Sequence, residues 1–398
     1  MQKQLSDRIN DMAESATLKM AALGRELKAQ GKDVISLSLG EPDFDTPAHI
    51  KEAAKVALDE GYTKYTPVPG LLEVREAISA KFKRDNQLDY SPNQIVISNG
   101  AKQAIANLSL SLLNPGDEAI IFAPYWVSYF EIIRLSGATP IIVSADIDQD
   151  YKVTPAQLEA AITDKTKIVL FSSPCNPTGS VYSLEELEAI AEVVAKNDKI
   201  VIISDEIYEY INFGDQHASI GTIESVKDRV VTINGFSKGY AMTGWRLGYM
   251  GAPEWIAKGC IKMQGQFTSG ANSFGQKASI AAIMGDQSPR LAMKAAFEKR
   301  RALVVDSLRE IPGFKVNMPT GAFYIFPDIS YYFGKSDGNV TIHNADDFAN
   351  YLLSTVYVAV VSGSAFGADK CMRISYAASE EELIEAVRRI KETVAKLK

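Results

Sequence analysis

The middle of the chain alternates short β-branched runs with amphipathic stretches of helical periodicity, and this alternation constrains the fold more than any other feature. Parallel strands need a crossover, usually a helix, so the pattern predicts an α/β domain with a mostly parallel seven-stranded sheet between helices. The expected strands are Gln94 to Ser98, Ala119 to Phe122, Pro140 to Val143, Lys167 to Phe171, Lys199 to Ile203, Val230 to Ile233 and Leu247 to Met250. Ser183 and Glu186 form a capping box that starts a helix running to about Ala195, which completes one strand–helix–strand unit.

The last hundred residues have a different character. Strand-like runs span Ala322 to Phe326, Val358 to Val361 and Met372 to Tyr376, and a long amphipathic helix opens at Ser379, where Glu382 completes a capping box. The first 45 residues hold one helical stretch and the strand-like Val34 to Leu39, which is too little for a core of their own. We therefore expect a large domain at 46–288 and a smaller, discontinuous α+β domain made of 1–45 and 289–398.

Composition excludes several classes of protein. The 398 residues carry 49 acidic and 42 basic side chains, and the net charge of −7 is spread along the chain, so no nucleic-acid partner is expected. Residues 1–7 have no apolar signal core and no stretch approaches the roughly 20 apolar residues of a membrane span, which predicts a cytoplasmic location and no membrane partner. Three cysteines and three histidines lie far apart, so we expect neither disulfides nor a metal site.

Unusual residues follow the predicted strands, where ligands bind in open α/β sheets. Gly100, Ala101 and Lys102 form a turn that opens a helix, and its free N–H groups could hold a phosphate, although most such turns are structural. Asn176 lies between two prolines and could donate from a rigid position or form an ordinary Asx turn. Asp205 ends a buried strand, where it could be catalytic or cap the next helix.

One cofactor would need all of these groups together. Pyridoxal phosphate requires a lysine for a Schiff base, a carboxylate at the pyridine nitrogen, donors to the 3-oxygen, an aromatic wall, and a phosphate cup with a cation. In that order, the candidates are Lys238, Asp205, Tyr208 with Asn176, Trp126, and Arg246 with Ser237. Each is weak evidence by itself, but together they predict a pyridoxal-phosphate enzyme. Its lysine would serve as the base that moves the substrate's Cα proton in a ping-pong reaction.

The motifs around these residues resemble those of a known family. They are Ser204-Asp205-Glu206-Ile207-Tyr208, Asn176-Pro177-Thr178-Gly179, Ser237-Lys238, Gly244-Trp245-Arg246-Leu247-Gly248 and Arg373-Ile374-Ser375-Tyr376. They resemble the signature of class I pyridoxal-phosphate aminotransferases, and Pro124-Tyr125-Trp126-Val127-Ser128-Tyr129 is similar to the bacterial aspartate aminotransferases. The resemblance implies the aspartate-aminotransferase-like fold, PLP fold type I. It also implies a homodimer with shared active sites, in which Tyr65 reaches the neighbouring subunit's cofactor phosphate.

The resemblance also implies substrate contacts. Gly40, Trp126, Asn176 and Arg373 match positions that contact the amino acid, with Arg373 gripping its α-carboxylate through two parallel donors. The segment 264–273 lacks the second arginine of the best-known aspartate enzymes, and Lys102 is the expected substitute for binding a distal carboxylate. The reaction implied is transfer of the amino group of L-aspartate to 2-oxoglutarate, giving oxaloacetate and L-glutamate. Ala13 and Glu14 stand where prephenate-using relatives place a basic residue, which argues against that substrate.

Other functions remain open from the residues alone. A pyridoxal-phosphate aminotransferase for aromatic or other amino acids, or a lyase or synthase on the same fold, would use the same cofactor groups. A nicotinamide dehydrogenase is disfavoured because no Gly-x-Gly-x-x-Gly follows the first strand. A non-catalytic regulator is disfavoured because every chemical group of the site is present.

Overall fold

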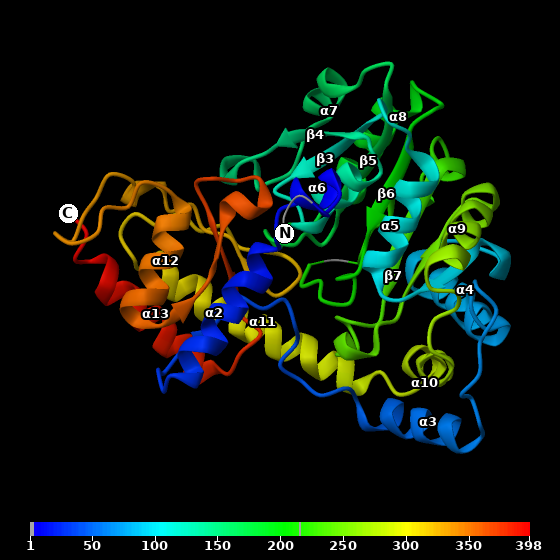
Figure 1. Cartoon of the computed structure of the whole chain (residues 1–398), viewed down its shortest axis with the longest axis horizontal. Coiled ribbons are helices and arrows are strands. Elements are labelled where there is room, and N and C mark those ends of the chain that lie inside the picture. Colours follow the sequence, from blue (N-terminus) through cyan, green and yellow to red (C-terminus); the bar gives the residue numbers. More distant parts are fainter. Residues whose placement is uncertain (1–3, 215) are drawn as a thin grey trace.

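The computed structural model describes residues 4–214 and 216–398, so residues 1–3 of the amino-terminal stretch considered above lie outside the described residues. A large lobe built on one sheet lies beside a smaller lobe that contains the carboxyl terminus, and the long helix α11 (Ser288–Arg309) runs from one to the other (Figure 1). No helix in the described part of the chain is long and apolar enough to cross a membrane.

The large sheet has seven strands in the order β2-β8-β7-β6-β5-β3-β4. Their bounds are β2 (Ile95–Ser98), β3 (Glu118–Ala123), β4 (Thr139–Ser144), β5 (Thr166–Ser172), β6 (Val201–Asp205), β7 (Val230–Gly235) and β8 (Gly248–Gly251). β8 is antiparallel to both of its neighbours, and the other adjacent pairs are parallel. The prediction of a mostly parallel seven-stranded sheet is therefore confirmed.

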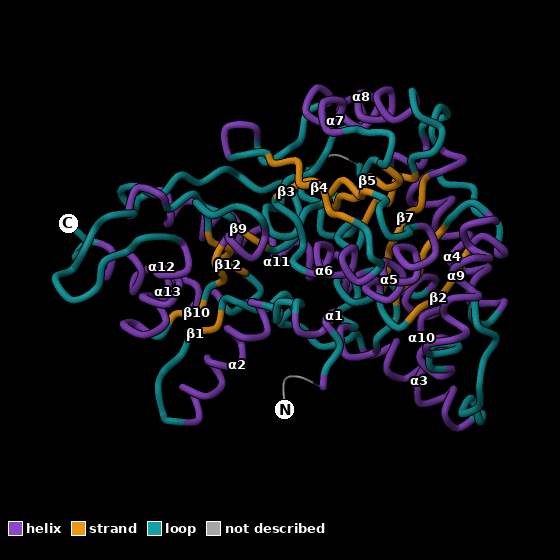
Figure 2. Tube along the Cα trace, turned by 45° about the horizontal axis from the view of Figure 1, so that its top comes forward, coloured by secondary structure: helices purple, strands orange, loops and turns teal. Residues whose placement is uncertain are grey.

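Helices cover both faces of this sheet because its strands alternate buried side chains between the two faces. Ala119 and Ile121 of β3 pack with α5 (Ala101–Leu112), α6 (Ser128–Leu135) and α9 (Glu254–Phe267). Ile120 and Phe122 pack with α7 (Pro155–Ala161) and α8 (Leu184–Ala195), and Figure 2 shows these two helices above the strands. The predicted capping box at Ser183 starts α8 as expected.

Three more helices close the end of the sheet formed by β2 and β8. They are α3 (Ala48–Asp59), α4 (Leu72–Asn86) and α10 (Ser273–Met284), and their buried side chains share one cluster with Ile95, Ile97 and Tyr249. Helix α4 brings Lys81 and Asn86 into contact with Glu209, in the turn that follows β6.

The smaller lobe combines two short sheets with helices. Its elements are α2 (Ala16–Ala29), β1 (Ile35–Ser36), β9 (Tyr324–Ile325), α12 (Ala345–Val356), β10 (Val358–Ala359), β11 (Val361–Ser362), β12 (Met372–Ser375) and α13 (Glu380–Val394). The short helix α1 (Asp7–Asn10) precedes them, and the Asp11 carbonyl that follows it accepts from Arg134 of α6 in the large lobe at 3.0 Å. β1 pairs in parallel with β10, and β11-β12-β9 form an antiparallel sheet. The amino-terminal Val34 and Leu37 lie in the hydrophobic core of this lobe. The exact domain boundaries at residues 46 and 289 stay a prediction.

Two of the strands expected in this lobe differ from prediction. The run from Val358 to Val361 is divided between β10 and β11, which belong to different sheets, because the chain leaves the parallel pair with β1 and joins the antiparallel pair with β12. The run from Ala322 to Phe326 is buried throughout, yet only Tyr324 and Ile325 form a strand. A buried apolar run does not by itself specify which residues find a ladder partner.

Candidate active site

The carboxyl edge of the large sheet gathers most of the predicted functional residues. Asp205 is the last residue of β6, and Asn176 and Lys238 follow β5 and β7, which run in the same direction. β8 runs the opposite way, so its amino end reaches this same edge and brings Arg246 to it. Arg373 comes from β12 of the smaller lobe. The site therefore lies where the two lobes meet.

These residues line one cavity of about 430 Å³, which falls in the size range of small-molecule sites. The predicted residues on its wall are Gly40, Ala101, Lys102, Trp126, Asn176, Asp205, Tyr208, Ser237, Lys238, Arg246 and Arg373. Gly100 lies just behind Arg246 instead of on the wall. Tyr65 is outside the cavity, and its side chain is 98% exposed in the single chain.

Lys238 occupies the centre of the cavity between the rings of Tyr208 and Phe323, with its Nζ 5.7 and 5.9 Å from their centroids. The ammonium donates to the backbone carbonyl of Gly40. Burial lowers the pKa of Lys238 to about 8, and the positive charge of Arg373 acts in the same direction. A lysine with this pKa exchanges its proton much nearer to neutral pH than an exposed lysine does.

Asp205 is buried and held by two donors. Its Oδ2 accepts from the Tyr129 hydroxyl at 2.6 Å, and its Oδ1 accepts from the Ile207 N–H at 3.2 Å. Burial raises the pKa of Asp205 to about 6, against the opposing effect of the Tyr129 hydrogen bond. A cationic group placed in the cavity would favour the ionised carboxylate. Tyr129 was not singled out from the sequence, although it ends the motif that begins at Pro124.

Arg373 and Asn176 are joined before any substrate arrives. Arg373 Nη1 donates to the Asn176 side-chain oxygen at 2.9 Å and Nη2 donates to the Ser38 carbonyl at 2.6 Å, whereas its buried Nε has no partner among the described residues. The guanidinium also stacks 4.6 Å from the Tyr324 ring centroid. A buried arginine with an unsatisfied donor is suited to binding an anion.

Tyr208 meets a partner that the sequence did not indicate. Its hydroxyl lies 2.7 Å from that of Tyr324, which belongs to β9 of the smaller lobe. Both tyrosines are buried, and burial raises the pKa of each. They therefore stay protonated near neutral pH, and one of the two hydroxyl protons is free to be donated into the cavity.

The start of α5 and Arg246 form a cationic corner. Gly100 has a φ of 82°, and a Cβ there would lie 2.3 Å from Arg246 Nη2, so only glycine fits. Lys102, in the first turn of α5, places its Nζ 4.9 Å from the Trp126 ring centroid. Partial burial and the neighbouring charge of Arg246 lower the pKa of Lys102. Helix amino termini with an adjacent arginine bind phosphate groups well.

The electrostatics of the cavity favour anionic ligands. Four cationic side chains line it, namely Lys102, Lys238, Arg246 and Arg373. Within residues 4–214 and 216–398, none of the four forms a salt bridge with a carboxylate. Cations without a carboxylate partner, a lysine with a lowered pKa and a buried aspartate in one cavity at the edge of an α/β sheet are the features expected of an enzyme active site.

Comparison with known proteins identifies the kind of enzyme. Residues 32–390 match the model of the family Aminotransferase class I and II, and the chain belongs to this family. A bifunctional aspartate aminotransferase and glutamate/aspartate-prephenate aminotransferase of Petunia hybrida is 47% identical over 99% of this chain and 83% of its own length. An aspartate aminotransferase of Bacillus sp. (strain YM-2) is 46% identical over 98% of this chain and 99% of its own.

Solved structures agree with this assignment. The aspartate aminotransferase from Rhizobium meliloti superposes with a TM-score of 0.96 at 40% identity, covering 99% of both chains. The enzyme from Thermus thermophilus, solved with maleate, gives a TM-score of 0.92 at 38% identity over 98% of this chain and 99% of that one. The protein is thus an aminotransferase with the aspartate-aminotransferase fold, as the sequence motifs predicted.

Proposed function

We propose that the protein is a pyridoxal-phosphate-dependent transaminase that passes the amino group of L-aspartate to 2-oxoglutarate, giving oxaloacetate and L-glutamate. The observation that carries the proposal is the shared cavity of Lys238 and Asp205, with unpaired cations on either side of them. The names of the relatives support aspartate as the donor, since all four of the relatives named above are called aspartate aminotransferases.

The residues present fit pyridoxal phosphate. The Gly100 turn and Arg246, together with Ser237, offer a phosphate site whose depth depends on the missing Cβ of Gly100. Asp205 would face the pyridine nitrogen, Tyr208 and the Asn176 amide would donate to the 3-oxygen, and Trp126 would stack on the ring. Once bound through Lys238, the cofactor supplies a cationic ring that accepts electrons from the substrate's Cα.

The chain's own groups would then bind the substrate and move its proton. Arg373 would bind the α-carboxylate and thereby set the orientation of the Cα–H bond, and its partner Asn176 and Gly40 lie on the same cavity wall. The free amine of Lys238 would take the proton from the substrate's Cα and hold it for return to the aldehyde carbon of the cofactor. Its pKa of about 8 leaves a usable fraction in the basic form near neutral pH.

Lys102 is proposed to bind the distal carboxylate of a dicarboxylic substrate. It carries no salt bridge in the described part of the chain and lies at the cavity wall beside Trp126. Replacing Lys102 with Ala should lower kcat/KM for aspartate about tenfold, the value of one hydrogen bond to a charged group, and leave apolar amino acids unaffected. Steady-state kinetics with both kinds of donor check this, with Lys102→Arg as the charge-retaining control. Equal losses for both donors would contradict the role.

Prephenate is a disfavoured substrate in this proposal, and this stays a prediction from the sequence. Some relatives are named aspartate/prephenate aminotransferases, among them one of Nitrosomonas europaea at 44% identity. In this chain Ala13 and Glu14 line a second cavity next to the active site, where the carboxylate of Glu14 would repel an additional acidic group.

We also propose that the protein is a homodimer with shared active sites, and that it is located in the cytoplasm. Tyr65 supports the homodimer, because this tyrosine between α3 and α4 is 98% exposed and contacts no other ring among the described residues, so its side chain is available to a second subunit. Its hydroxyl would complete the phosphate site of the partner subunit.

The absorption spectrum of the purified protein tests the proposed function directly. With pyridoxal phosphate supplied, a visible band is expected that disappears on addition of aspartate and returns with 2-oxoglutarate, which would establish both halves of the reaction. A band that other amino acids bleach but aspartate does not would retain the cofactor and reject the donor. No visible band at all would reject the cofactor.

A further inference from the structure

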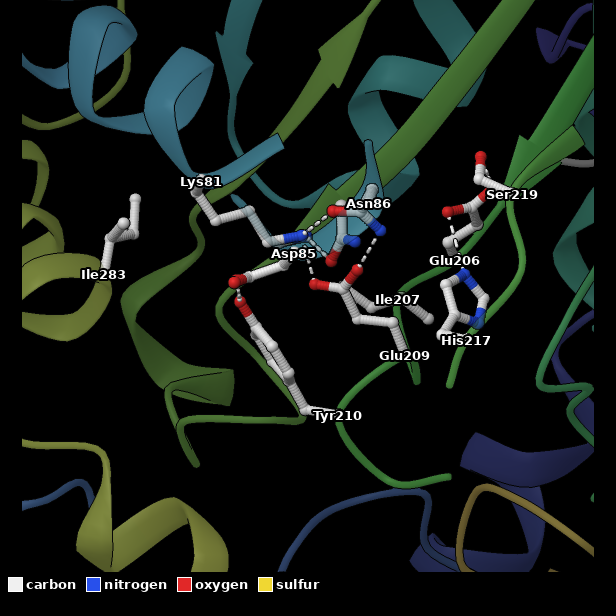
Figure 3. A network of polar contacts seen from close by, with 12 residues as sticks. Lys81, Asp85, Asn86, Glu206, Ile207, Glu209, Tyr210, His217, Ser219 and Ile283 are labelled. Atoms are coloured by element: carbon white, nitrogen blue, oxygen red, sulfur yellow. Dashed lines mark hydrogen bonds and ion pairs between the residues drawn. The ribbon is translucent and has the colours of Figure 1, made fainter. Parts of the chain in front are cut away.

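A second cluster of charged side chains lies buried behind the turn that carries Asp205 and Tyr208, and the proposed reaction does not use it (Figure 3). Its ionisable side chains are Lys81, Glu206, Glu209 and His217, and their exposed fractions are 0, 1, 3 and 7% respectively. Buried charges are costly, so such a cluster needs a structural or a functional reason.

Glu206 is the member nearest to the active site in the chain. Successive side chains of an extended strand point to opposite sides, so Asp205 enters the cavity and Glu206 points away from it into the cluster. The Glu206 N–H bonds to the Ile233 carbonyl of β7 at 2.8 Å, which extends the strand geometry past Asp205. Glu206 is absent from the cavity wall. The two carboxylates are therefore adjacent in sequence but face different surroundings.

The carboxylate of Glu206 is fully coordinated by donors. Its Oε1 accepts from the hydroxyls of Ser204 at 3.0 Å and Ser219 at 2.7 Å, and its Oε2 lies 2.9 Å from His217 Nε2. Both serines are neutral. The only group in contact with Glu206 that can carry a positive charge is therefore His217, within the part of the chain that the structure describes.

Glu209, by contrast, has its own permanent counter-charge. Lys81 of α4 pairs with Glu209 and donates to Asn86 Oδ1 at 2.7 Å, while Asn86 Nδ2 donates to Glu209 Oε2 at 2.6 Å. Within this triad the positive charge of Lys81 offsets the negative charge of Glu209. Among the residues that the structure describes, Glu206 and Glu209 from the turn and Lys81 from α4 are the charged groups that act on His217. The net charge of the cluster therefore depends on whether His217 holds its proton.

We propose that His217 is a positioning residue for amino transfer: as an imidazolium it cancels the charge of Glu206 behind Asp205, and so keeps Asp205 in the ionised state that the cofactor ring requires. This inference rests on the proposed function. His217 acts through Glu206 and Asp205 and touches no ligand. Its effect is electrostatic, transmitted across one residue of backbone in a buried region where charges are weakly screened.

The acid–base properties of the groups agree with this role. Burial alone would lower the pKa of His217, but the charge and hydrogen bond of Glu206 outweigh it, and the net shift is upward from 6.5. The negative charge of Glu206 is, after burial, among the effects that raise the pKa of Asp205. As pH rises through the elevated pKa of His217, its proton is lost and the charge of Glu206 becomes uncompensated. The contribution of the His217–Glu206 pair to the stability of the fold is thus complete below about pH 6.5, and it is lost as the pH rises through the elevated pKa of His217.

A bound metal is the alternative explanation for the cluster. Glu206, Glu209 and His217 each offer a ligand atom within 4.8 Å of the others, a proximity that their spacing in the sequence did not reveal. Lys81 already contacts Glu209, however, and a second cation there would be repelled. The contacts therefore favour an ion-paired histidine over a metal site.

Three variants test the proposal in the cofactor-loaded enzyme: His217→Gln, Glu206→Gln and the double variant. The readout is the pH at which the visible absorption of the bound cofactor titrates. In His217→Gln the negative charge of Glu206 has no counter-charge. This charge favours the protonated form of the bound cofactor, so the pH at which its absorption titrates should rise by about one unit. Glu206→Gln and the double variant leave no unbalanced charge and should titrate like the wild type. Ser219→Ala, which removes a neutral donor to the same carboxylate, is the matched control.

A role in packing alone would give a different pattern. Glu206→Gln would then shift the titration of the cofactor absorption at least as much as His217→Gln, and the double variant would not return to the wild-type value. That result, or an unchanged titration in His217→Gln, would overturn the proposal. So would a stoichiometric metal ion in the wild type that His217→Gln loses.

A second measurement needs neither cofactor nor activity. The chain has only three histidines, so the His217 ring signals in an NMR titration can be assigned from the His217→Gln spectrum. His217 should titrate above 6.5 in the wild type and lower in Glu206→Gln, and a wild-type value at or below 6.5 would refute the proposal. If the wild type forms no visible band, the proposed function fails, whereas the histidine titration still reports on the His217–Glu206 pair.

Discussion

Replacing Lys238 with Ala is expected to lower the rate of transamination by at least about 10⁴-fold, because in the proposed reaction this one side chain is both the covalent anchor of the cofactor and the base that moves the Cα proton. Among the described residues, no other side chain of the cavity is placed to take over both of these roles. The other cations of the cavity are Lys102, which lies against Trp126, and two arginines that stay protonated. The measurement is kcat/KM with aspartate and 2-oxoglutarate, together with the visible spectrum.

Lys238→Arg is the matched control, because it keeps a positive charge beside Asp205 but cannot form the covalent bond or act as a base. It should be as inactive as Lys238→Ala while retaining a melting temperature close to that of the wild type. Normal transamination in either variant would remove Lys238 from the mechanism.

The pH dependence of Lys238 has a definite sign. Its pKa is lowered to about 8 by burial and then by Arg373, so in the free enzyme the neutral amine predominates above that pH. The rate at which an amine-directed reagent modifies Lys238 should therefore level off near pH 8 to 9, well below the range of an exposed lysine. Arg373→Gln removes a positive charge and should shift this profile to higher pH.

The second large effect is expected from Asp205→Asn, which should lower kcat about 10³-fold. The amide oxygen can still accept from the Tyr129 hydroxyl, although the amide nitrogen cannot replace the oxygen that accepts from the Ile207 N–H, and the side chain carries no charge to keep the pyridine nitrogen of the proposed cofactor protonated. Without that proton the ring accepts electrons poorly, and the step at Cα slows. Single-turnover kinetics with aspartate separate this step from substrate binding.

Asp205→Glu keeps the charge and is the control for this prediction. It should lose less activity than Asp205→Asn even though its longer side chain disturbs the bond to Tyr129. If the two variants lost activity equally, geometry instead of charge would explain the role of Asp205.

The local sequence was sufficient to predict the strands of the large sheet. Most of its strands are apolar runs buried on both faces, with the partly exposed edge strand β4 as an exception, and such runs specify strands within a residue or two of their ends. Because ligands bind at the carboxyl edge of such a sheet, the order of strands and helices alone predicts that the polar residues after β5, β6 and β7 share one site. Capping boxes at Ser183 and Ser379 likewise specify helix starts through neighbouring atoms alone.

What required the tertiary structure are the contacts that link residues far apart in the chain. Tyr129 and Asp205 are 76 positions apart, and Tyr208 and Tyr324 are 116 apart. No periodicity encodes such pairs, since they depend on how helices and lobes pack and on which hydroxyl points at which oxygen. The division of Val358 to Val361 between two sheets has the same origin.

The sequence by itself thus determined the class of fold and the family, and it singled out Lys238 and Asp205 as the candidate reactive groups. The tertiary structure decided how those groups are held and charged. It buried Asp205 under Tyr129, joined Arg373 to Asn176, and set His217 against Glu206 on the far side of the same turn. The physical reason is that burial and the nearby charges set the pKa of a side chain, and both exist only once the chain has folded.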